Sequence, residues 1–500
     1  MSKGKLLAVC FVWLAIVGAM AAAYRILIYN PNREEVFETT GSSSNYKHNV
    51  GVALDSFSGY AILRSPYLKK ELASKKIRLN FVDDGADYPA RLESLSSGKT
   101  PVAVFTIDAL LKTCEQSGSL PGTIVAIIDE TRGADAIVAY ESAVPNIDAL
   151  NRTDMKFVLT PDSPSDTLTR AVMSQYQMDN LPKNPYIKAK DAEDVYKQWV
   201  KTNPKAPRAF VLWEPYVSKI LANPNTHVVA DSSQHRGYIV DAIVVNRDYL
   251  VNNHDVVREI LGAYFRARYH YRDNMVQLVL DDAKKTGAPL KPAQAENLVN
   301  GIWWKNTQEN FAHFGLQSSG QLQLLEDMIT GITRVLSITD AIQQDPTNGQ
   351  PTDLYYDQLL KELKSSNFHP QLASEKLRDE VIRLPKLNPK QWEQLVPIGT
   401  LAVPDLVFPR GRSVLTGTAK ATLDDLVAQL QTLPQAYVIV KGNASRVGDL
   451  EANKIKARER AVAAASYLRD KGLDPNRIRP VSGEPSGATS VRFVLGQPPY

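Results

Sequence analysis

The residues that could bind a small ligand stand at the ends of predicted strands. They carry hydroxyl groups, aromatic rings and charges of both signs. In open α/β sheets, ligands bind beyond the carboxyl ends of the strands, so we expect these side chains to gather at one site. They are Ser56, Phe57, Tyr60, Thr106, Asp108, Glu130, Arg132, Ser163, Ser165, Trp213 and Glu214.

Residues 50–66 are the stretch around which this site is organised. Apolar residues alternate up to Leu54, as in a buried strand, and a small polar loop follows. We expect Ser56 or Ser58 to cap a helix that carries Tyr60. The first turn of such a helix offers free N–H groups and the positive end of the helix dipole, which favour an anion. An ordinary turn between a strand and a helix is the alternative interpretation.

The side chains leave the charge of the ligand open. Hydroxyl groups and helix N-termini suit an anion such as a sulfonate or phosphate, whereas Asp108, Glu130 and Glu214 suit an amine, and a zwitterion satisfies both. A carboxylate at a buried strand end needs a partner, so we expect Glu214 to pair with a ligand amine or with Arg132. Structural roles compete with binding, because the three aromatic residues of the set could pack in a core and Asp129 could pair with Arg132.

The sequence favours a binding protein over an enzyme. No GxSxG, HExxH or CxxC motif occurs, the seven histidines are scattered, and no nucleophile stands beside a base. We therefore expect neither catalysis nor a metal or cofactor. An enzyme with such strand-end loops, for example a pyrimidine-precursor synthase, would need a histidine or lysine in them, and they offer none. The net charge of +4, from 58 basic and 54 acidic residues, is too balanced to favour nucleic acid as a partner.

The N-terminal segment predicts an extracytoplasmic protein. Lys3 and Lys5 precede an apolar run, Leu6–Tyr24, about as long as a helix that spans a membrane. A cleaved signal peptide is the alternative, and the length of the run favours an uncleaved anchor. By the positive-inside rule we expect the bulk of the chain to lie outside the cytoplasm. Cys10 lies in this run, so Cys114 has no disulfide partner in the rest of the chain.

At 500 residues, the chain should hold more than two domains. Residues 1–29 form the anchor or signal segment, and residues 30–49 form a polar tether. Residues 50–365 alternate strands and helices, which predicts an α/β unit with largely parallel sheets in two lobes. The lobes should separate near Tyr140–Asp154 and rejoin near Asp231–Asp241. The predicted strands are Val50–Leu54, Ile77–Val82, Val102–Thr106, Thr123–Asp129, Ala136–Tyr140, Lys156–Thr160, Ala209–Trp213, Thr226–Ala230 and Asp241–Asn246.

The last part of the chain predicts a separate unit. Residues 366–402 are rich in proline and are expected to form a stiff linker. Residues 403–500 follow the order βαβαβ, which predicts a two-layer α+β sandwich. Its expected strands are Leu406–Phe408, Tyr437–Lys441 and Ser490–Leu495, and its expected helices are Thr418–Gln431 and Asn453–Lys471.

Five stretches carry a resemblance to a known family. They are VGVALDSFSGY at Val50–Tyr60, AVFTIDA at Ala103–Ala109, IIDETRGADAIVA at Ile127–Ala139, FVLTPDSPS at Phe157–Ser165 and LWEP at Leu212–Pro215. They resemble the substrate-binding proteins of the nitrate, sulfonate and taurine class of ABC importers. The resemblance covers about residues 50–365 and implies the two-lobed fold of a type II periplasmic binding protein. It also implies a small ligand held between the lobes by the strand-end residues named above, and an ABC permease as a partner.

The C-terminal unit is similar to the OmpA-like, peptidoglycan-associated domain. The similarity lies in FPRGRSVL at Phe408–Leu415 and GNASRVGDLEANKIKARERA at Gly442–Ala461. In that family an aspartate and an arginine hold the diaminopimelate of the wall peptide. Arg460 matches the arginine, Asn453 matches a family asparagine, and Ser445 stands in place of the aspartate. A serine cannot offer an ammonium group the charge-assisted contact of a carboxylate. The resemblance implies peptidoglycan as a partner.

These features predict an exported, membrane-tethered protein that binds a small polar solute. The solute is expected to be an anion or zwitterion resembling a sulfonate, nitrate or phosphate, bound for ABC-type uptake or for sensing. The OmpA-like unit would attach the protein to the cell envelope. The alternative is a wall-attached scaffold or sensor with no transport role, because a permanent wall contact would hamper a receptor that must diffuse to its permease.

Overall fold

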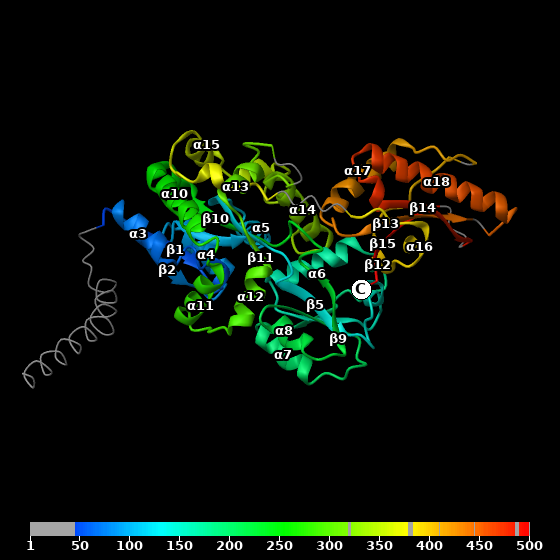
Figure 1. Ribbon diagram of the computed structural model, residues 1–500, viewed down its shortest axis with the longest axis horizontal. Coiled ribbons are helices and arrows are strands. Elements are labelled where there is room, and N and C mark those ends of the chain that lie inside the picture. The colour runs from blue at the N-terminus through cyan, green and yellow to red at the C-terminus, as the bar shows by residue number, and fades with distance from the viewer. Residues whose placement is uncertain are drawn as a thin grey trace, which may run out of the picture.

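The computed structural model describes residues 46–318, 322–378, 384–409, 411–444, 446–485 and 490–499. They form two α/β lobes and a C-terminal module (Figure 1). The apolar run Leu6–Tyr24 lies outside these residues. Within them, no helix has the length and apolar character needed to cross a membrane.

The first lobe is built on a six-stranded sheet with the strand order β11-β4-β10-β3-β1-β2. β1 to β4 run parallel to one another, and β10 and β11 run antiparallel to β4. Every residue of β3, β4 and β10 is buried, as is typical of central strands covered on both faces. The strands are β1 His48–Leu54, β2 Ile77–Asp83, β3 Val102–Thr106, β4 Gly122–Thr131, β10 Val240–Asn246 and β11 Ile302–Trp304.

Helices cover this sheet, and several begin at side-chain caps. Ser65 accepts the N–H of Leu68 at the start of α3, and Asp87 accepts the N–H of Ala90 at the start of α4. The helices of the first lobe are α3 Pro66–Ser74, α4 Tyr88–Ser96, α5 Ile107–Ser117, α9 Arg247–Asn252, α10 His254–His270, α11 Met275–Lys285, α12 Pro292–Asn300, α13 Thr307–His313, α14 Leu325–Ile338 and α15 Gln358–Ser365.

The second lobe is built on a five-stranded sheet with the order β7-β6-β8-β5-β9. β5 runs antiparallel to both of its neighbours, and β6, β7 and β8 run parallel. The strands are β5 Asp135–Tyr140, β6 Lys156–Leu159, β7 Tyr186–Lys188, β8 Arg208–Trp213 and β9 Thr226–Asp231, and the helices are α6 Pro164–Gln175, α7 Ala192–Val200 and α8 Tyr216–Leu221.

Two segments connect the lobes. β4 continues into β5 through residues 132–134, and β9 returns to β10 through residues 232–239. The return lies where the sequence predicted it, but the first crossing at Tyr140–Asp154 is wrong, because β5 already belongs to the second sheet. The short connection around Gly133 is typical of a hairpin, yet its two strands join different sheets. All the strands predicted for the lobes are confirmed, and β7 and β11 are additional.

The helix expected after Ser56 or Ser58 is not formed. A single 3₁₀ turn, Ser58–Tyr60, follows β1 and has no side-chain cap. The next helix, α3, begins only at Pro66, which suits the first helical position because its missing N–H is not needed there. No α-helical N-terminus therefore offers its free N–H groups at Ser56 or Ser58.

The C-terminal module has a four-stranded sheet with the order β12-β15-β13-β14. β13 is parallel to β14 and antiparallel to β15, and α18 packs against β13 and β14. The predicted order βαβαβ lacked one strand, because β14 precedes β15. The predicted strand Leu406–Phe408 is also wrong, since β12 opens the sheet. The elements are β12 Val396–Thr400, α17 Gly417–Gln431, β13 Tyr437–Ala444, α18 Leu450–Asp470, β14 Ile478–Pro485 and β15 Val491–Gln497.

The segment predicted as a linker is packed at both ends. At one end, residues 366–378 lie on the first lobe, where Arg266 donates to the carbonyl oxygen of Phe368 at 2.8 Å. At the other end, Tyr437 of the module donates its hydroxyl to the carbonyl of Pro385 at 2.7 Å, just before α16 Pro389–Glu393. β12, which the predicted linker included, belongs to the sheet of the module.

The module also contacts the second lobe and the return crossing. The N–H of Arg236 donates to the carbonyl of Thr432 at 3.0 Å. The side-chain amide of Gln175 donates to the hydroxyls of Tyr238 at 2.9 Å and Thr432 at 3.2 Å, and its oxygen lies 2.8 Å from Nδ1 of His235. Burial lowers the pKa of His235 to about 3, so this ring is neutral. One buried hydrogen-bond network thus joins α6, the return crossing and the module.

The substitution Gly442→Ala should loosen the module. A Cβ at this position would lie 2.0 Å from the carbonyl oxygen of Ala457, so α18 would have to move away from β13. Overpacking of this kind costs about 1–3 kcal/mol. We expect faster hydrogen exchange in β13 and α18, measured by mass spectrometry.

Gly331→Ala is the matched control. This glycine lies on α14, and an added methyl group meets no atom within 4 Å. Because alanine favours the helix, exchange should stay unchanged or slow down. Equal exchange in the two variants would contradict the close packing of α18 on β13.

Candidate functional site

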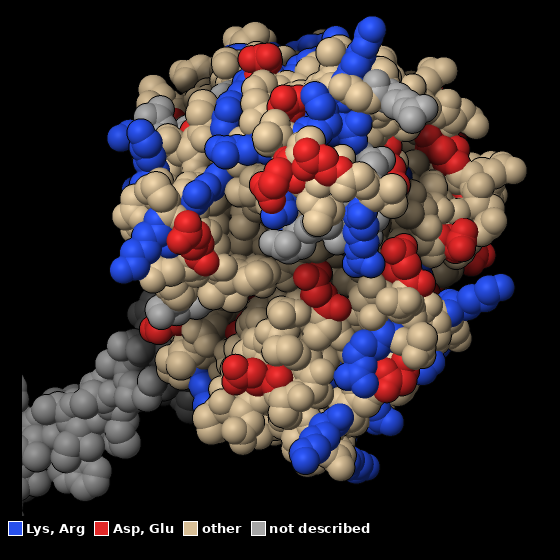
Figure 2. All heavy atoms as spheres, turned by 90° about the vertical axis from the view of Figure 1, so that its right-hand side faces the viewer, with Lys and Arg blue, Asp and Glu red and all other residues tan. Residues whose placement is uncertain are grey.

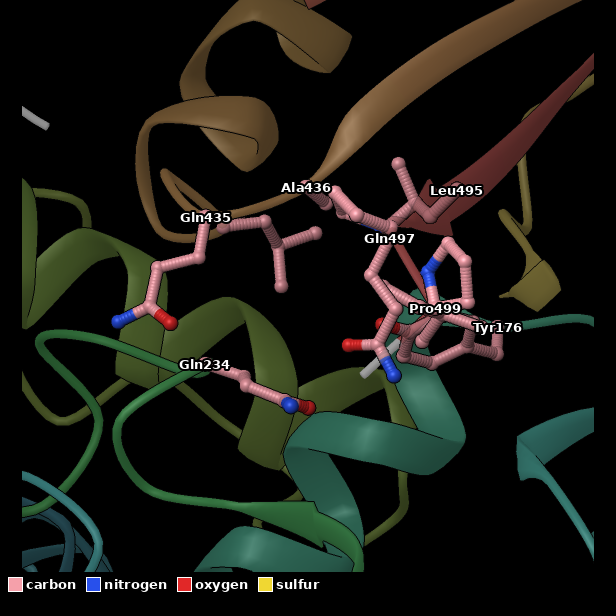
Figure 3. A pocket seen from close by; sticks show the side chains of 10 residues that line it. Tyr176, Gln234, Gln435, Ala436, Leu495, Gln497 and Pro499 are labelled. Carbon is pink, nitrogen blue, oxygen red and sulfur yellow. The ribbon is translucent and has the colours of Figure 1, made fainter. Parts of the chain in front are cut away.

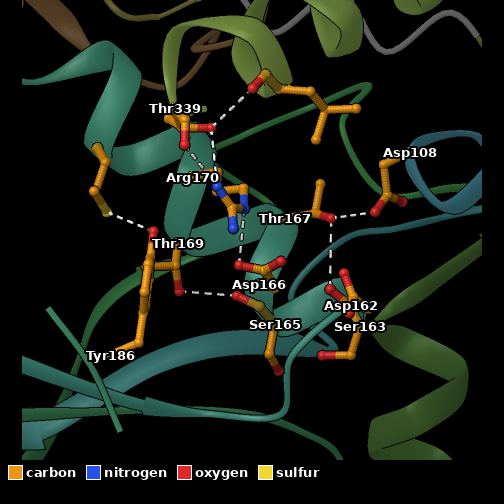
Figure 4. Close-up of polar contacts among 12 residues, drawn as sticks. Asp108, Asp162, Ser163, Ser165, Asp166, Thr167, Thr169, Arg170, Tyr186 and Thr339 are labelled. Carbon is orange, nitrogen blue, oxygen red and sulfur yellow. Dashed lines mark hydrogen bonds and ion pairs between the residues drawn. The ribbon is translucent and has the colours of Figure 1, made fainter. Parts of the chain in front are cut away.

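The two lobes touch where α5 and α6 begin (Figure 4). Asp108, in the first turn of α5, accepts a hydrogen bond of 2.5 Å from the hydroxyl of Thr167 on α6. The ammonium group of Lys112 lies 3.4 Å from a carboxylate oxygen of Asp162 and 3.7 Å from one of Asp166. Burial lowers the pKa of Lys112, but the surrounding carboxylates outweigh it and raise the pKa. We call this contact region the seam.

α14 of the first lobe strengthens the seam from a second side. Arg170 of α6 holds Asp166 at 2.9 Å and donates to the carbonyl of Thr339, directly after α14, at 2.9 Å. Figure 4 shows this guanidinium between the two groups. The start of α6 is therefore fixed to the first lobe by side chains of α5 and by the backbone carbonyl of Thr339 after α14.

Buried hydroxyl groups at the seam include some without a hydrogen-bond partner. Ser163 donates its hydroxyl to the carbonyl of Thr160 at 2.7 Å. The side-chain oxygens of Ser165 and Thr160, and Oδ1 of Asp108, have no partner among the described residues. Ser165 is fully buried. An unpaired buried polar atom costs free energy, because its hydrogen bonds to water are lost and not replaced.

A group of carboxyl side chains lies at the ends of the crossing strands. Asp241 at the start of β10 lies opposite Asp129 at the end of β4, and Tyr60 donates its hydroxyl to Asp241 at 2.8 Å. Burial raises the pKa of Asp241 to about 7 and raises that of Asp129, to which the charge of Asp241 contributes. Burial likewise raises the pKa of Asp135, at the start of β5, to about 7. Asp108 of the seam is close enough to raise the pKa of both Asp135 and Asp241.

Glu130 and Arg132 have protein partners on the other face of β4, because successive strand residues point to opposite faces. The Glu130 carboxylate lies 2.6 Å from the ammonium group of Lys305 and accepts the N–H of Gly237 at 2.9 Å. Burial would raise the pKa of Glu130, but Lys305 and Arg132 hold it at about 2. The guanidinium of Arg132 lies 3.4 Å from the ring centre of Trp303. The expected pairing of Arg132 with Asp129 is not formed, since the two residues' side chains have different neighbours.

Glu214 has a protein partner other than Arg132, and its expected pairing with a ligand amine stays a prediction. Its carboxylate accepts the hydroxyl of Ser218, one helical turn later, at 2.7 Å. Ser218 in turn accepts a hydrogen bond of 2.9 Å from Asn297 of α12, so a second contact joins the lobes. Trp213 lies half-buried, opposite Asp135 in the ladder between β8 and β5.

The loop with Ser56 and Phe57 is held by two arginines. Arg64 donates to the carbonyl oxygens of Asp55 at 2.9 Å and Phe57 at 2.7 Å. The fully buried Arg91 lies 3.1 Å from the Asp55 carboxylate. The ring of Phe57 meets that of Tyr60 edge to face at 5.4 Å, and Ser56 is half-buried. Of the predicted set, the structure brings Asp108 and Ser163 to the seam contact, with Thr106 and Ser165 as their helix neighbours.

The predicted wall-binding residues lie on α18 of the module. Asn453 and Arg460 are two helical turns apart, on one face. Asn453 donates to the carbonyl of Val447 at 2.8 Å, and Arg460 donates to that of Arg412 at 3.2 Å. Ser445 lies outside the described residues. Figure 2 shows Lys and Arg mixed with Asp and Glu over the face that carries the module, so this face has no single charge.

Comparison with known proteins separates the two parts of the chain. Residues 407–490 match the OmpA family. Outer membrane protein A of Bordetella avium is 31% identical over 74 residues, and the peptidoglycan-associated lipoprotein of Brucella melitensis biotype 1 is 30% identical over 77. Each match covers 15% of this chain and, respectively, 38% and 46% of the relative, so the chain spans less than half of either one.

Similar solved structures cover more than 60% of this chain. The alkanesulfonate-binding protein SsuA of Xanthomonas axonopodis pv. citri, bound to MOPS, is 13% identical, with a TM-score of 0.45 over 62% of this chain and 99% of that one. The periplasmic nitrate-binding protein NrtA of Synechocystis PCC 6803 is 12% identical, with a TM-score of 0.47 over 65% and 90%. Both are binding proteins.

Removing Lys305 should destabilise the crossing strongly. In Lys305→Met, the Glu130 carboxylate stays buried without a cation, which costs about 3–5 kcal/mol. The folded-state pKa of Glu130, about 2, lies below its unfolded value. The stabilisation is therefore present above pH 4.5 and is lost as the pH falls toward 2, and urea unfolding across this range measures it.

The double variant Lys305→Met/Glu130→Gln is the control for this experiment. The glutamine oxygen can still accept the Gly237 N–H, and no charge is left unpaired, so part of the stability should return. If the double variant is no more stable than Lys305→Met, the ion pair is not what the crossing depends on.

The pair Asp129–Asp241 should make stability fall as the pH rises. The folded protein holds the Asp241 proton up to a pKa of about 7, against an ordinary value of 3.8. Between these values the folded state binds more protons than the unfolded state, so rising pH destabilises the protein. Asp241→Asn should flatten this slope in urea unfolding between pH 4 and 8. Asp273→Asn, at an exposed site, should leave it unchanged, and an unchanged slope in Asp241→Asn would refute the assignment.

Proposed function

We propose that the two lobes bind a small polar solute outside the cytoplasm, and that the OmpA-family part attaches the protein to the cell envelope. The observation that carries the proposal is the seam. Two α/β lobes joined by two crossings meet at the first turns of α5 and α6, where Ser165 and Thr160 keep buried hydroxyl groups without a partner. The donors of these groups and of the α6 N-terminus suit an anionic group of the solute.

The carboxyl groups support a solute that also carries an amine. Asp129, Asp135 and Asp241 are buried near the seam, and a bare anion would meet their repulsion there. A cationic group would offset the cost of ionising them. A zwitterion, with its anionic end at α6 and its amine toward these carboxyl groups, satisfies both halves of the seam. Of the two ligand classes expected from the sequence, an anion and a zwitterion, this favours the zwitterion.

Uptake or sensing would follow from movement of the lobes. The crossings at residues 132–134 and 232–239 are short, as the hinges between two rigid bodies usually are. Solute binding would replace the direct contact of Asp108 with Thr167 by contacts through the solute. A permease that recognises the closed arrangement is the partner that the uptake hypothesis requires, and the N-terminal apolar run would hold the protein at the membrane.

A scaffold or sensor without transport is the second candidate. The module packs on α6 and on the return crossing through the buried network of Gln175, His235 and Thr432. A wall-bound module would therefore hold the second lobe in place, which suits a fixed sensor better than a shuttling receptor. Uptake assays with a neighbouring permease gene deleted distinguish the two candidates.

The solute hypothesis is tested with Ser165→Ala in a thermal-shift screen. Taurine, amino acids, primary amines, nitrate, sulfate and phosphate are added to the full chain, and zwitterions should raise the unfolding midpoint. Because the Ser165 hydroxyl has no hydrogen-bond partner among the residues that the structure describes, its removal should not lower the midpoint without solute. Losing one hydrogen bond to the solute should weaken binding about tenfold.

Ser174→Ala on the same helix is the matched control, since its hydroxyl is bonded to the carbonyl of Ala171. It should keep the shift of the unmodified protein. An equal loss in both variants would remove Ser165 from the site. A screen in which no compound shifts the midpoint would favour the scaffold.

Wall attachment is tested with diaminopimelate and the full chain. Arg460→Ala should abolish binding measured by calorimetry, because the ligand carboxylate loses its charged donor. Arg458→Ala, exposed on the same helix, should leave it intact. Ser445→Asp should tighten binding about tenfold by restoring a carboxylate for the ammonium group. Equal affinity in all three variants would argue against this site.

A further inference from the structure

The C-terminal module is bonded to the second lobe, although it follows the first lobe in the chain. The N–H of Gln177, just after α6, donates to the carbonyl of Thr400 at the end of β12, at 2.9 Å. Gly399 allows this close approach, because a Cβ there would lie 2.7 Å from the ring of Tyr176. The end of α6 is therefore held against the first strand of the module.

Figure 3 shows the same contact from close by. A cavity of 240 Å³ lies in it, and Tyr176 is one of the lining residues. Gln234 of the return crossing lies across the cavity from Gln435 and Ala436 of the module. Because protein interiors are usually close-packed, this contact is looser than a core, and its hydrogen bonds carry much of it.

The module is held to the first lobe through residues 366–378, which we call the strap. The carbonyl of Lys376 accepts a hydrogen bond from the side-chain amide of Asn306 at 2.8 Å. The carboxylate of Glu375 accepts the N–H of Thr307 at 3.1 Å. These contacts fix the strap to the start of α13, directly after β11.

Arg378, at the end of the strap, makes a charged contact with the first lobe. Its guanidinium donates to both carboxylate oxygens of Glu309, at 2.7 and 2.9 Å. The Glu309 side chain is fully buried, whereas that of Arg378 is 42% exposed. A two-pronged pair between charged groups is stronger than a neutral hydrogen bond, so this contact is a main attachment of the strap.

Glu309 connects Arg378 to the segments that join the lobes. Its carboxylate also accepts the indole N–H of Trp303 at 3.1 Å. The ring centre of Trp303 lies 3.4 Å from the guanidinium of Arg132, in the first crossing, and 3.5 Å from the ammonium group of Lys305. Release of Arg378 would therefore reach the place about which the lobes would move.

Given the lobe movement proposed above, we infer that the strap and the module form a third connection between the lobes, which restrains their separation. Arg378 is the positioning residue at its first-lobe end. If the lobes separate, either the strap must leave the first lobe or the module must leave the second. The module is bonded to Pro385, only seven positions after Arg378, and so short a chain spans at most about 25 Å. The position of the module therefore biases the equilibrium between closed and open lobes.

Thiol labelling of the full chain tests this restraint without a solute. Ser165→Cys places a thiol at the seam, where the side chain is fully buried, so the thiol reacts only when the lobes separate. Cys114 is buried in the first lobe, and burial raises its pKa to about 12. It reacts only when that lobe unfolds and serves as the internal control. Cys10→Ser removes the remaining native thiol.

Arg378→Gln should speed labelling at the seam about tenfold, because the buried Glu309 carboxylate loses a charge-assisted pair. Labelling of Cys114 should change much less. Arg378→Lys, which keeps a cation, should restore part of the slow rate. Arg272→Gln is the matched control, since its partner Asp273 is exposed on the same lobe, and it should leave both rates unchanged.

Gly399→Ala tests the other end of the connection, because it drives the module away from Tyr176. It should also speed labelling at the seam. The two ends act in series, so Arg378→Gln/Gly399→Ala should label no faster than the faster single variant. Multiplied effects in the double variant, an unchanged seam rate in Arg378→Gln, or an equal acceleration at Cys114 would overturn the restraint. None of these outcomes depends on whether a solute binds.

Discussion

The structure depends on how charge is buried where β4 leaves the first lobe. Asp129 and Glu130 are consecutive, so they point to opposite faces of the strand, and both are buried. On one face Glu130 meets Lys305, and on the other Asp129 meets Asp241. A buried carboxylate needs a counter-charge or a proton. On the first face the Lys305 ammonium group supplies the counter-charge, and on the second face the raised pKa of Asp241 keeps a proton on the acid pair.

These two solutions fix the crossings to each other. Glu130 also accepts the N–H of Gly237, so the outgoing strand holds the returning segment directly. The pair Asp129–Asp241 on the other face lowers the stability of the fold near neutral pH, because burial opposes the ionisation of both carboxyl groups. An amine that entered the seam, as proposed above, would offset this cost. The same carboxyl groups therefore link the architecture to the proposed solute.

The C-terminal module is in direct contact with the segment that connects the two lobes. The return crossing forms contacts with the first lobe through Gly237, with α6 through His235 and Gln175, and with the module through Arg236. A force or ligand that acts on the module thus reaches the segment about which the lobes would move. The proposed wall attachment and the proposed solute binding would therefore be coupled through the eight residues between β9 and β10.

The sequence alone determined most of the lobe strands, the return crossing and the two-part organisation, because long apolar runs and helix caps are local signals. It missed β7, β11, β12 and β14, which are short or carry proline and glycine, so that no alternation of apolar and polar residues marks them. Only the tertiary structure decided the partners of the charged residues. Lys305, which pairs with Glu130, lies 175 positions from it in the sequence. Glu214 accepts a hydrogen bond from Ser218 and does not pair with Arg132. It also placed the first crossing at Gly133, because a short connection does not reveal whether its strands will pair with each other or with distant ones.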